Sequence, residues 1–165
     1  MDEPDVLSDQ HLMLFGSIVQ WFAHYELTIQ RAISGILRIE VSSAVLLTRD
    51  LDFTRKRAAL LDLVKERALP DDFWERIFAF LAVPATRASL QDQIVHSTWK
   101  KSPEPASIQP NWILRLPPGI EPTYRAPVSD DTSYSLDLLG EIVRDLAENH
   151  ERFVTYLIDQ GVVPA

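Results

Sequence analysis

SLDLLGEIVRDLAENHERFVTYLIDQG, residues 135–161, is the stretch that decides the fold class. Its apolar side chains recur at alternating steps of three and four, which places them on one stripe of an α-helix. Ser135 suits an N-cap and Gly161 suits the left-handed residue that ends a helix. A stripe this long predicts packing along another helix or along a second copy of itself. The stripe comprises Leu136, Leu139, Val143, Leu146, His150, Phe153 and Leu157.

A second long amphipathic helix is predicted from about Ser8 to Arg38. Residues 41–48 could be a strand or a short helix, and the helical surroundings favour the helix. Further helices are predicted from Asp52 or Thr54 to Arg67 and at residues 70–83 and 85–98. Pro84 should kink or break the chain between the last two, because proline removes one backbone donor. Residues 102–131 hold most of the prolines, which predicts an irregular excursion, with strands near 112–116 and 123–126 around a turn at 117–119. We therefore expect a single all-α domain over residues 1–165. It is predicted to be an up-and-down helical bundle of four to five helices with a proline-rich excursion or short hairpin before the last helix.

The composition narrows the classes of function. A formal net charge of −8 is repelled by phosphate backbones, so we expect no DNA partner, although a local basic patch stays open. That patch would lie on residues 52–67, where a solvated helical face is the alternative. Cysteine is absent, which excludes disulfides and thiolate metal sites. The acidic first eight residues and the lack of a long apolar run predict a cytoplasmic protein without a membrane partner.

One polar cluster could carry chemistry. Asp92 and His96 are four residues apart, so a helix stacks them on one face, and Trp99 would cover the same side. A carboxylate can hold an imidazole in one tautomer and raise its basicity. The alternative is a purely structural Asp–His pair. Metal binding with Glu26 as third ligand lacks the four ligands of a closed site, so no metal or other cofactor is expected.

The order QDQIVHSTW at residues 91–99 resembles the signature helix of HEPN-type domains, in which an Arg and a polar residue precede a His, a small residue and Trp. The layout is also similar over about residues 14–157. A long first helix carries Trp21 and Glu26, a leucine-rich helix carries Lys56, and a final long helix follows the histidine. The specific motif covers fewer than ten residues.

The resemblance implies a metal-independent RNA-cleaving site shared across a homodimer. It implies His96 as acid or base at the ribose 2′-hydroxyl, with Asp92 and the residue at position 91 beside it. It also implies a substrate-binding surface formed by Glu26, Lys56, Arg87 and Trp99. The usual Arg is replaced by Gln91, which cannot neutralise a phosphate. Arg87 lies nine residues before His96, half a turn off its face, and could serve only from a distorted helix or a partner chain.

Three functions remain open at this point. The first is a HEPN-like dimer that binds RNA or an antitoxin-like protein and is catalytically weak or degenerate. The second is an active endoribonuclease of toxin type. The third is a purely structural interaction bundle, in which the Asp92–His96 pair has no chemical role.

Overall fold

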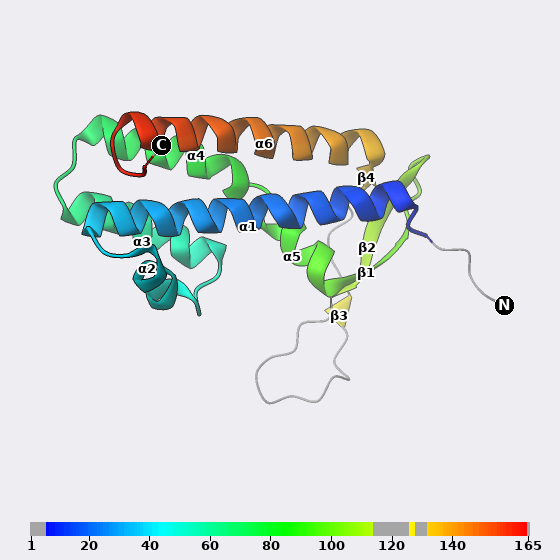
Figure 1. Ribbon diagram of the computed structural model, residues 1–165. Helices are drawn as coiled ribbons and strands as arrows, with labels where there is room; N and C mark the ends of the chain where they lie inside the picture. The colour runs from blue at the N-terminus through cyan, green and yellow to red at the C-terminus, as the bar shows by residue number, and fades with distance from the viewer. Residues whose placement is uncertain (1–5, 114–125, 128–131, 165) are drawn as a thin grey trace. The chain divides into compact units, whose positions relative to one another are not determined.

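The computed structural model describes residues 6–113, 126–127 and 132–164, and this part of the chain is mostly helical (Figure 1). The helices are α1 (Asp9–Leu37), α2 (Val41–Thr48), α3 (Phe53–Glu66), α4 (Asp71–Ala85), α5 (Ala88–His96) and α6 (Leu136–Asp159). The strands are β1 (Ser97–Lys101), β2 (Ser107–Ile113), β3 (Ala126–Pro127) and β4 (Tyr134–Ser135). The helical class is confirmed, but the expectation of an all-α fold is wrong because these strands form a small sheet.

Three predicted helix starts are confirmed by their capping hydrogen bonds. The Ser8 hydroxyl accepts from the His11 amide at 3.3 Å, the Asp52 carboxylate from the Arg55 amide at 2.8 Å, and the Ser135 hydroxyl from the Leu138 amide at 3.1 Å. Each bond satisfies one amide of a first turn that has no partner within its helix. Local side-chain chemistry therefore sets where α1, α3 and α6 begin.

The helix predicted over residues 85–98 is shorter than expected, and the hairpin begins earlier. Residues 97–101 pair with residues 108–113 in an antiparallel register, so the chain is extended directly after His96. The register shifts between Thr98 and Trp99, because Asn111 on β2 is skipped between the pairs Thr98–Trp112 and Trp99–Pro110. Pro110, beside this bulge, has no amide to donate to a ladder. Strand β2 also pairs with β3 and β4. The helical periodicity predicted a helix as far as Thr98, but the pairing of residues 97 and 98 with β2 ends the helix at His96.

The predicted strand at 112–116 is confirmed only at Trp112 and Ile113, which belong to β2. The turn predicted at 117–119, and the returning strand up to residue 125, lie outside the described residues. In the part of the chain that the structure describes, no helix is long and apolar enough to cross a membrane.

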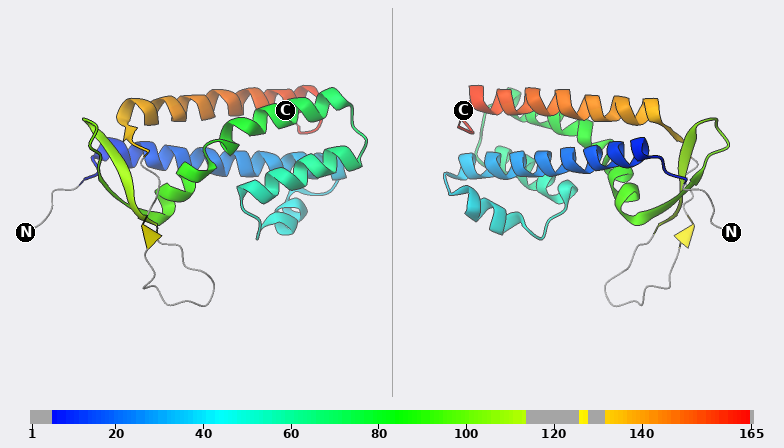
Figure 2. Two further views of the ribbon diagram at one scale, coloured as in Figure 1. Left: turned by 180° about the vertical axis from the view of Figure 1, so that it is seen from behind. Right: turned by 45° about the vertical axis from the view of Figure 1, so that its right-hand side comes forward.

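The chain divides into two compact units, one formed by residues 1–19 and 89–144 and the other by residues 20–88 and 145–165. In the first unit, the β1–β2 hairpin contacts the start of α1 through Phe15 and Trp99 (Figure 2). The core of this unit includes the buried side chains of Phe15, Ile18, Leu90, Ile108, Tyr134, Leu139 and Ile142.

The second unit packs α3 and α4 with the later turns of α1 and α6. Its largest fully buried side chains are Tyr25, Ile29, Leu60, Val64, Ile77, Leu81, Leu146, Phe153 and Leu157. The predicted stripes of the two long helices are thus largely confirmed as core, although Ile36, Leu136, Val143 and His150 are only half-buried. About 25 cal/mol per Å² of apolar burial makes such stripes the main source of stability.

Pro84 lies inside the last turn of α4, so the predicted interruption falls one residue before the helix ends at Ala85. Because proline has no amide hydrogen, the carbonyl of Phe80 loses its usual i+4 donor. The buried side chain of Asn149 on α6 donates to that carbonyl at 2.8 Å and also to the hydroxyl of Tyr25 at 2.6 Å. Tyr25 in turn donates to the carbonyl of Leu146 at 3.1 Å. This network ties α1, α4 and α6 together.

Candidate functional site

Asp92 and His96 lie on one face of the last turns of α5, as their spacing predicted. The His96 Nε2 atom is 3.8 Å from the Asp92 Oδ1 atom, which is ion-pair distance but too long for a direct hydrogen bond. The side chains are 47% and 37% exposed, respectively, so solvent and ligands reach both. The shared face is confirmed, but at this distance the carboxylate does not hold the imidazole in one tautomer through a direct hydrogen bond.

Trp99 does not continue the helical face of His96, so its predicted position is wrong. It lies on β1, where its ring packs against Phe15 with centroids 4.6 Å apart and meets the edge of Tyr134 at 5.9 Å. Strand side chains alternate between two faces, and this alternation turns Trp99 toward α1 rather than along the α5 axis. Trp99 thus anchors the hairpin to α1.

Gln91, at the position of the missing arginine, is half-buried on α5. Two neighbours fix this helix from its buried side. Leu90 is 4% exposed, and the Gln93 side chain, also 4% exposed, accepts a hydrogen bond from the Tyr134 hydroxyl at 3.3 Å. The Gln93–Tyr134 contact was missed by sequence reasoning, since forty-one residues separate the partners. This hydrogen bond holds α5 against β4 and so fixes the position of the helix that carries Asp92 and His96.

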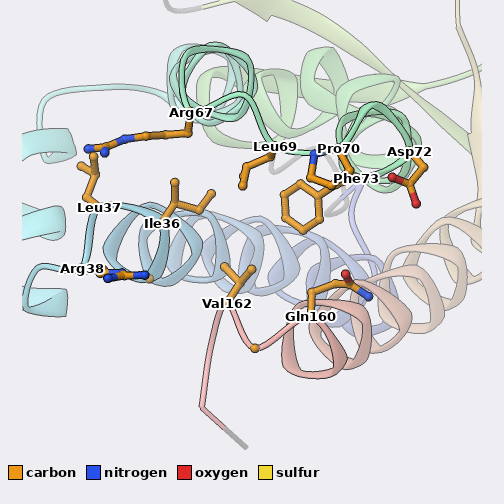
Figure 3. A pocket seen from close by; sticks show the side chains of 12 residues that line it. Ile36, Leu37, Arg38, Arg67, Leu69, Pro70, Asp72, Phe73, Gln160 and Val162 are labelled. Carbon is orange, nitrogen blue, oxygen red and sulfur yellow. The ribbon is translucent and has the colours of Figure 1, made fainter.

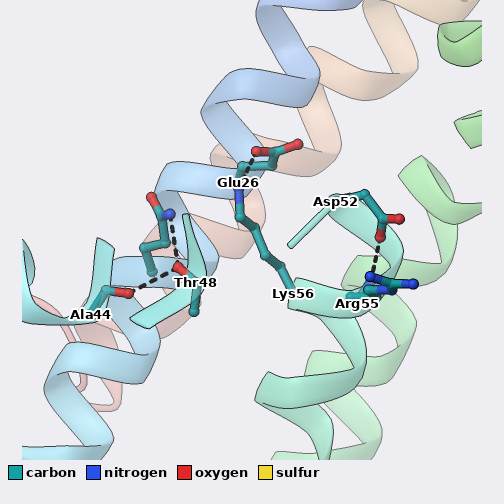
Figure 4. A network of polar contacts seen from close by, with 7 residues as sticks. Glu26, Ala44, Thr48, Asp52, Arg55 and Lys56 are labelled. Atoms are coloured by element: carbon teal, nitrogen blue, oxygen red, sulfur yellow. Dashed lines mark hydrogen bonds and ion pairs between the residues drawn. The ribbon is translucent and has the colours of Figure 1, made fainter. Parts of the chain in front are cut away.

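Lys56 and Glu26 form an ion pair between α3 and α1 in the second unit (Figure 4). The Lys56 side chain is only 7% exposed, whereas Glu26 retains 32% exposure. Nearby, the Gln30 side chain donates to the Thr48 hydroxyl at 2.9 Å, which links α1 to α2. A buried ammonium is costly unless it is paired, so Glu26 serves first to neutralise Lys56. Their predicted role at the rim of the His96 site stays a prediction.

Arg87 is not on the helix of His96. It lies in the turn between α4 and α5, where its amide donates to the Pro84 carbonyl at 2.9 Å, and its side chain is half-buried. Of the predicted site residues, Gln91, Asp92, His96 and Trp99 belong to the first compact unit, and Glu26, Lys56 and Arg87 to the second.

Two exposed cations follow the pair directly. Lys100 and Lys101 lie on β1, and both are exposed. Ammonium groups bind phosphates as compact point charges, so this strand can contact a phosphate-bearing ligand, although not from position 91. Sequence reasoning missed these lysines because it continued the helix as far as Thr98.

Two histidines, His24 and His150, lie close together in the second unit. His150 on α6 contacts Thr28 through its Nε2 atom, 2.9 Å from the hydroxyl, and its ring centroid lies 5.8 Å from that of His24. Trp21 lies against both rings, at 5.2 and 5.5 Å. Burial lowers the pKa of His150, and a hydrogen bond that its imidazole donates to the backbone carbonyl of His24 partly opposes that effect. This half-buried histidine is hydrogen-bonded on both sides, as expected of a structural residue.

The described residues contain no group of three or more His, Cys, Asp or Glu side chains placed to hold a metal ion. An imidazole and a carboxylate can take part in proton transfer and hydrogen bonding. No protein-family model, curated protein or solved structure matches the chain.

Proposed function

We propose that the chain is a HEPN-like domain that binds single-stranded RNA and cleaves it weakly or not at all. The proposal includes the family's up-and-down bundle, a symmetric homodimer and a cytoplasmic location. The observation that carries it is the exposed Asp92–His96 pair at the end of α5, 3.8 Å apart.

The surroundings of the pair support RNA as the ligand. The His96 and Asp92 side chains are 47% and 37% exposed, so a ligand can reach the imidazole and the carboxylate from solvent. Lys100 and Lys101 lie exposed on the strand that begins where α5 ends. In a chain of net charge −8, two exposed cations on the strand that follows the accessible imidazole favour a phosphate-bearing ligand over non-specific attraction.

Gln91 supports the weak activity. Cleavage by attack of the ribose 2′-hydroxyl needs a group that moves a proton and a cation that stabilises charge on the phosphorus oxygens. His96 supplies the first, whereas Gln91 carries no charge to supply the second. The loss of one such electrostatic contact typically costs about 100- to 1000-fold in rate.

The binding test measures fluorescence anisotropy of a labelled, mixed-sequence single-stranded RNA with the full chain at two salt concentrations. We expect the double variant Lys100→Glu/Lys101→Glu to bind at least about tenfold more weakly and to show a shallower salt dependence, because fewer counterions are released. Arg49→Glu/Arg152→Glu, two exposed charge reversals at the end of α2 and on α6, changes the net charge by the same amount and should bind as the unaltered chain does. An equal loss of RNA affinity in both variants would mean that the net charge, and not the position of the two lysines, determines binding.

The activity test compares the unaltered chain, Gln91→Arg, and Gln91→Arg/His96→Ala on the same RNA without metal. The proposal requires cleavage to rise in the first variant and to vanish in the second. Strong cleavage by the unaltered chain would favour the active toxin-type ribonuclease instead.

A second candidate function rests on α2. Leu46 and Leu47 on this short helix are 64% and 68% exposed, and Val41 is 41% exposed. Adjacent exposed leucines are typical of protein-interaction surfaces. If the chain is an interaction module instead, Leu46→Ser/Leu47→Ser should abolish self-association in light scattering, while RNA binding should be absent in every variant.

A further inference from the structure

The second unit contains a cavity of about 620 Å³ where the ends of four helices meet (Figure 3). It is lined by the ends of α1, α3 and α6 and by the start of α4. Ile36, Leu69 and Phe73 contribute apolar side chains to it. Small-molecule sites typically occupy about 300–1,000 Å³, so the cavity has the volume of a binding site for a molecule of several hundred daltons.

The backbone builds this cavity by ending three helices in the same way. The residues Arg38, Ala68 and Gly161, which follow α1, α3 and α6, have φ angles of 56°, 49° and 67°. In each case a left-handed residue ends the helical path of the chain. Arg38 and Gly161 line the cavity themselves, and Ala68 lies between the lining residues Arg67 and Leu69. Only Gly161 adopts this conformation without cost, so Arg38 and Ala68 hold local strain next to the cavity.

Gly35 fixes the wall between α1 and the C-terminal turn. A Cβ atom at this position would lie 1.8 Å from the carbonyl oxygen of Val162, a distance that no side chain tolerates. The turn after α6 can therefore lie directly on α1, where Val162 closes one side of the cavity.

Charged side chains of opposite sign lie on opposite sides of the apolar side chains that line the cavity. Figure 3 shows Arg38 and Arg67 on one side of Ile36 and Phe73, and Asp72 on the other. Within the described residues, neither arginine forms an ion pair. Each arginine follows the C-terminal end of a helix, whose negative partial charge it offsets in part, yet a full positive charge remains available at each.

We propose that this cavity binds a zwitterion whose carboxylate and ammonium groups are separated by an apolar body, as in a dipeptide of apolar residues. The guanidinium groups of Arg38 and Arg67 bind the carboxylate, and the carboxylate of Asp72 binds the ammonium group. The side chains of the ligand lie on Ile36, Leu69 and Phe73. A simple anion would leave Asp72 unused, and a simple cation would be repelled by two arginines.

The test uses the full chain and the dipeptide Leu-Leu in isothermal titration calorimetry. Four analogues complete the set: N-acetyl-Leu-Leu, Leu-Leu amide, free leucine, and the doubly blocked N-acetyl-Leu-Leu amide. We expect saturable binding of Leu-Leu with a Kd of about 1 mM or below, and at least tenfold weaker binding when either end is blocked. Free leucine should also bind weakly, since its two charges share one carbon atom and cannot reach both sides.

Three variants assign each charge to its partner. Arg38→Gly and Arg67→Gln should weaken Leu-Leu about tenfold but leave Leu-Leu amide unchanged, because the amide has no carboxylate to lose. Asp72→Asn should weaken Leu-Leu but not N-acetyl-Leu-Leu. Arg38→Gly is the most informative variant, since glycine suits its φ of 56° and the melting temperature should hold or rise. Arg49→Ala, an exposed arginine away from the cavity lining, is the control.

No saturable binding of Leu-Leu up to about 10 mM would overturn the proposal. Binding that ignores both blocked ends, or equal affinity for free leucine, would overturn the assignment of separated charges. Loss of binding in Arg49→Ala as well would also overturn it, because the effect would then follow net charge rather than the cavity.

Discussion

Replacing Asn149 by alanine tests whether one side chain on α6 compensates for the proline inside α4. Asn149 is 5% exposed and donates two hydrogen bonds, to the Phe80 carbonyl at 2.8 Å and the Tyr25 hydroxyl at 2.6 Å. In Asn149→Ala the Phe80 carbonyl is left with neither an amide at position 84 nor a side-chain donor. An unsatisfied buried polar group costs about 1–3 kcal/mol, and the second lost bond adds about 1 kcal/mol. We therefore expect about 2–4 kcal/mol of lost unfolding free energy.

The background Pro84→Ala isolates the mechanism. Alanine restores an amide at position 84, which can donate to the Phe80 carbonyl within the helix. In that background the cost of Asn149→Ala should fall by about 1–2 kcal/mol, a coupling expected only between groups that share a partner. Tyr25→Phe is a useful companion, since it removes the other acceptor of Asn149 and leaves the Phe80 contact intact.

The assay is urea unfolding followed by far-ultraviolet circular dichroism, with the four members of the cycle measured at one temperature. The change should appear in the midpoint and not in the slope, because the surface exposed on unfolding is nearly the same. A cost below about 0.5 kcal/mol would mean that water or another donor satisfies the Phe80 carbonyl. An equal cost in both backgrounds would refute the link between Asn149 and Pro84.

Four further predictions follow from the same contacts. Light scattering at micromolar concentration should give about twice 18.8 kDa, and a monomer at every concentration would contradict the homodimer. Phe153→Ala and Leu146→Ala, both at fully buried positions, should each cost about 2–5 kcal/mol in urea unfolding, against under 0.5 kcal/mol for the exposed Glu151→Ala. Glu26→Gln should cost about 2–3 kcal/mol in the same assay, less than for a fully buried pair because Glu26 is 32% exposed, and Glu26→Gln/Lys56→Met should recover part of it. Burial lowers the pKa of His150 in the folded state, so its contribution to stability should be constant above the ordinary value of 6.5 and fall as the pH drops from there through the lower folded pKa. In unfolding experiments between about pH 7.5 and 5, His150→Gln should reduce this fall. The remainder should come from His11, whose pKa is also lowered by burial.

The parts of the fold that the sequence predicts well are those fixed by local chemistry. Ser8, Asp52 and Ser135 cap helices through hydrogen bonds to amides three residues ahead, so short-range spacing is sufficient to find them. Gly161 ends α6 with a left-handed backbone for an equally local reason. The apolar stripes predict the buried faces of the long helices correctly, because an α-helix repeats every 3.6 residues whatever surrounds it.

The early hairpin could not be found in this way. Residues 97–101 form a strand because residues 107–113 are available to pair with them, and that pairing depends on the turn between them. Periodicity alone does not distinguish the end of a short helix from the start of a strand. The prediction therefore aligned Trp99 with the helical face of His96, whereas Trp99 lies in the sheet, and it did not recognise that Lys100 and Lys101 belong to the same strand.

In the candidate site too, local spacing was predictable from the sequence and tertiary contacts were not. The contact of Asp92 with His96 was predictable from four-residue spacing, but its length of 3.8 Å was not. Lys56 lies in the most basic stretch of the sequence, which fits a solvated face, yet its side chain is 7% exposed and paired with Glu26 thirty residues earlier. Only tertiary packing decides which of several adjacent cations turns inward.

The structure of α5 makes Gln91→Arg a fair test of the proposed function. Leu90 and Gln93 hold the helix from its buried side, and the Gln93 side chain is fixed by Tyr134. Gln91 is half-buried beside them, and arginine has a flexible apolar stem that can cover the same surface while its guanidinium reaches solvent. The substitution therefore adds a cation about 1.4 helical turns before His96 without removing a contact that supports the helix. If the variant folds as stably as the unaltered chain and still cleaves no RNA, the missing arginine is not what limits activity, and the Asp92–His96 pair has some role other than catalysis.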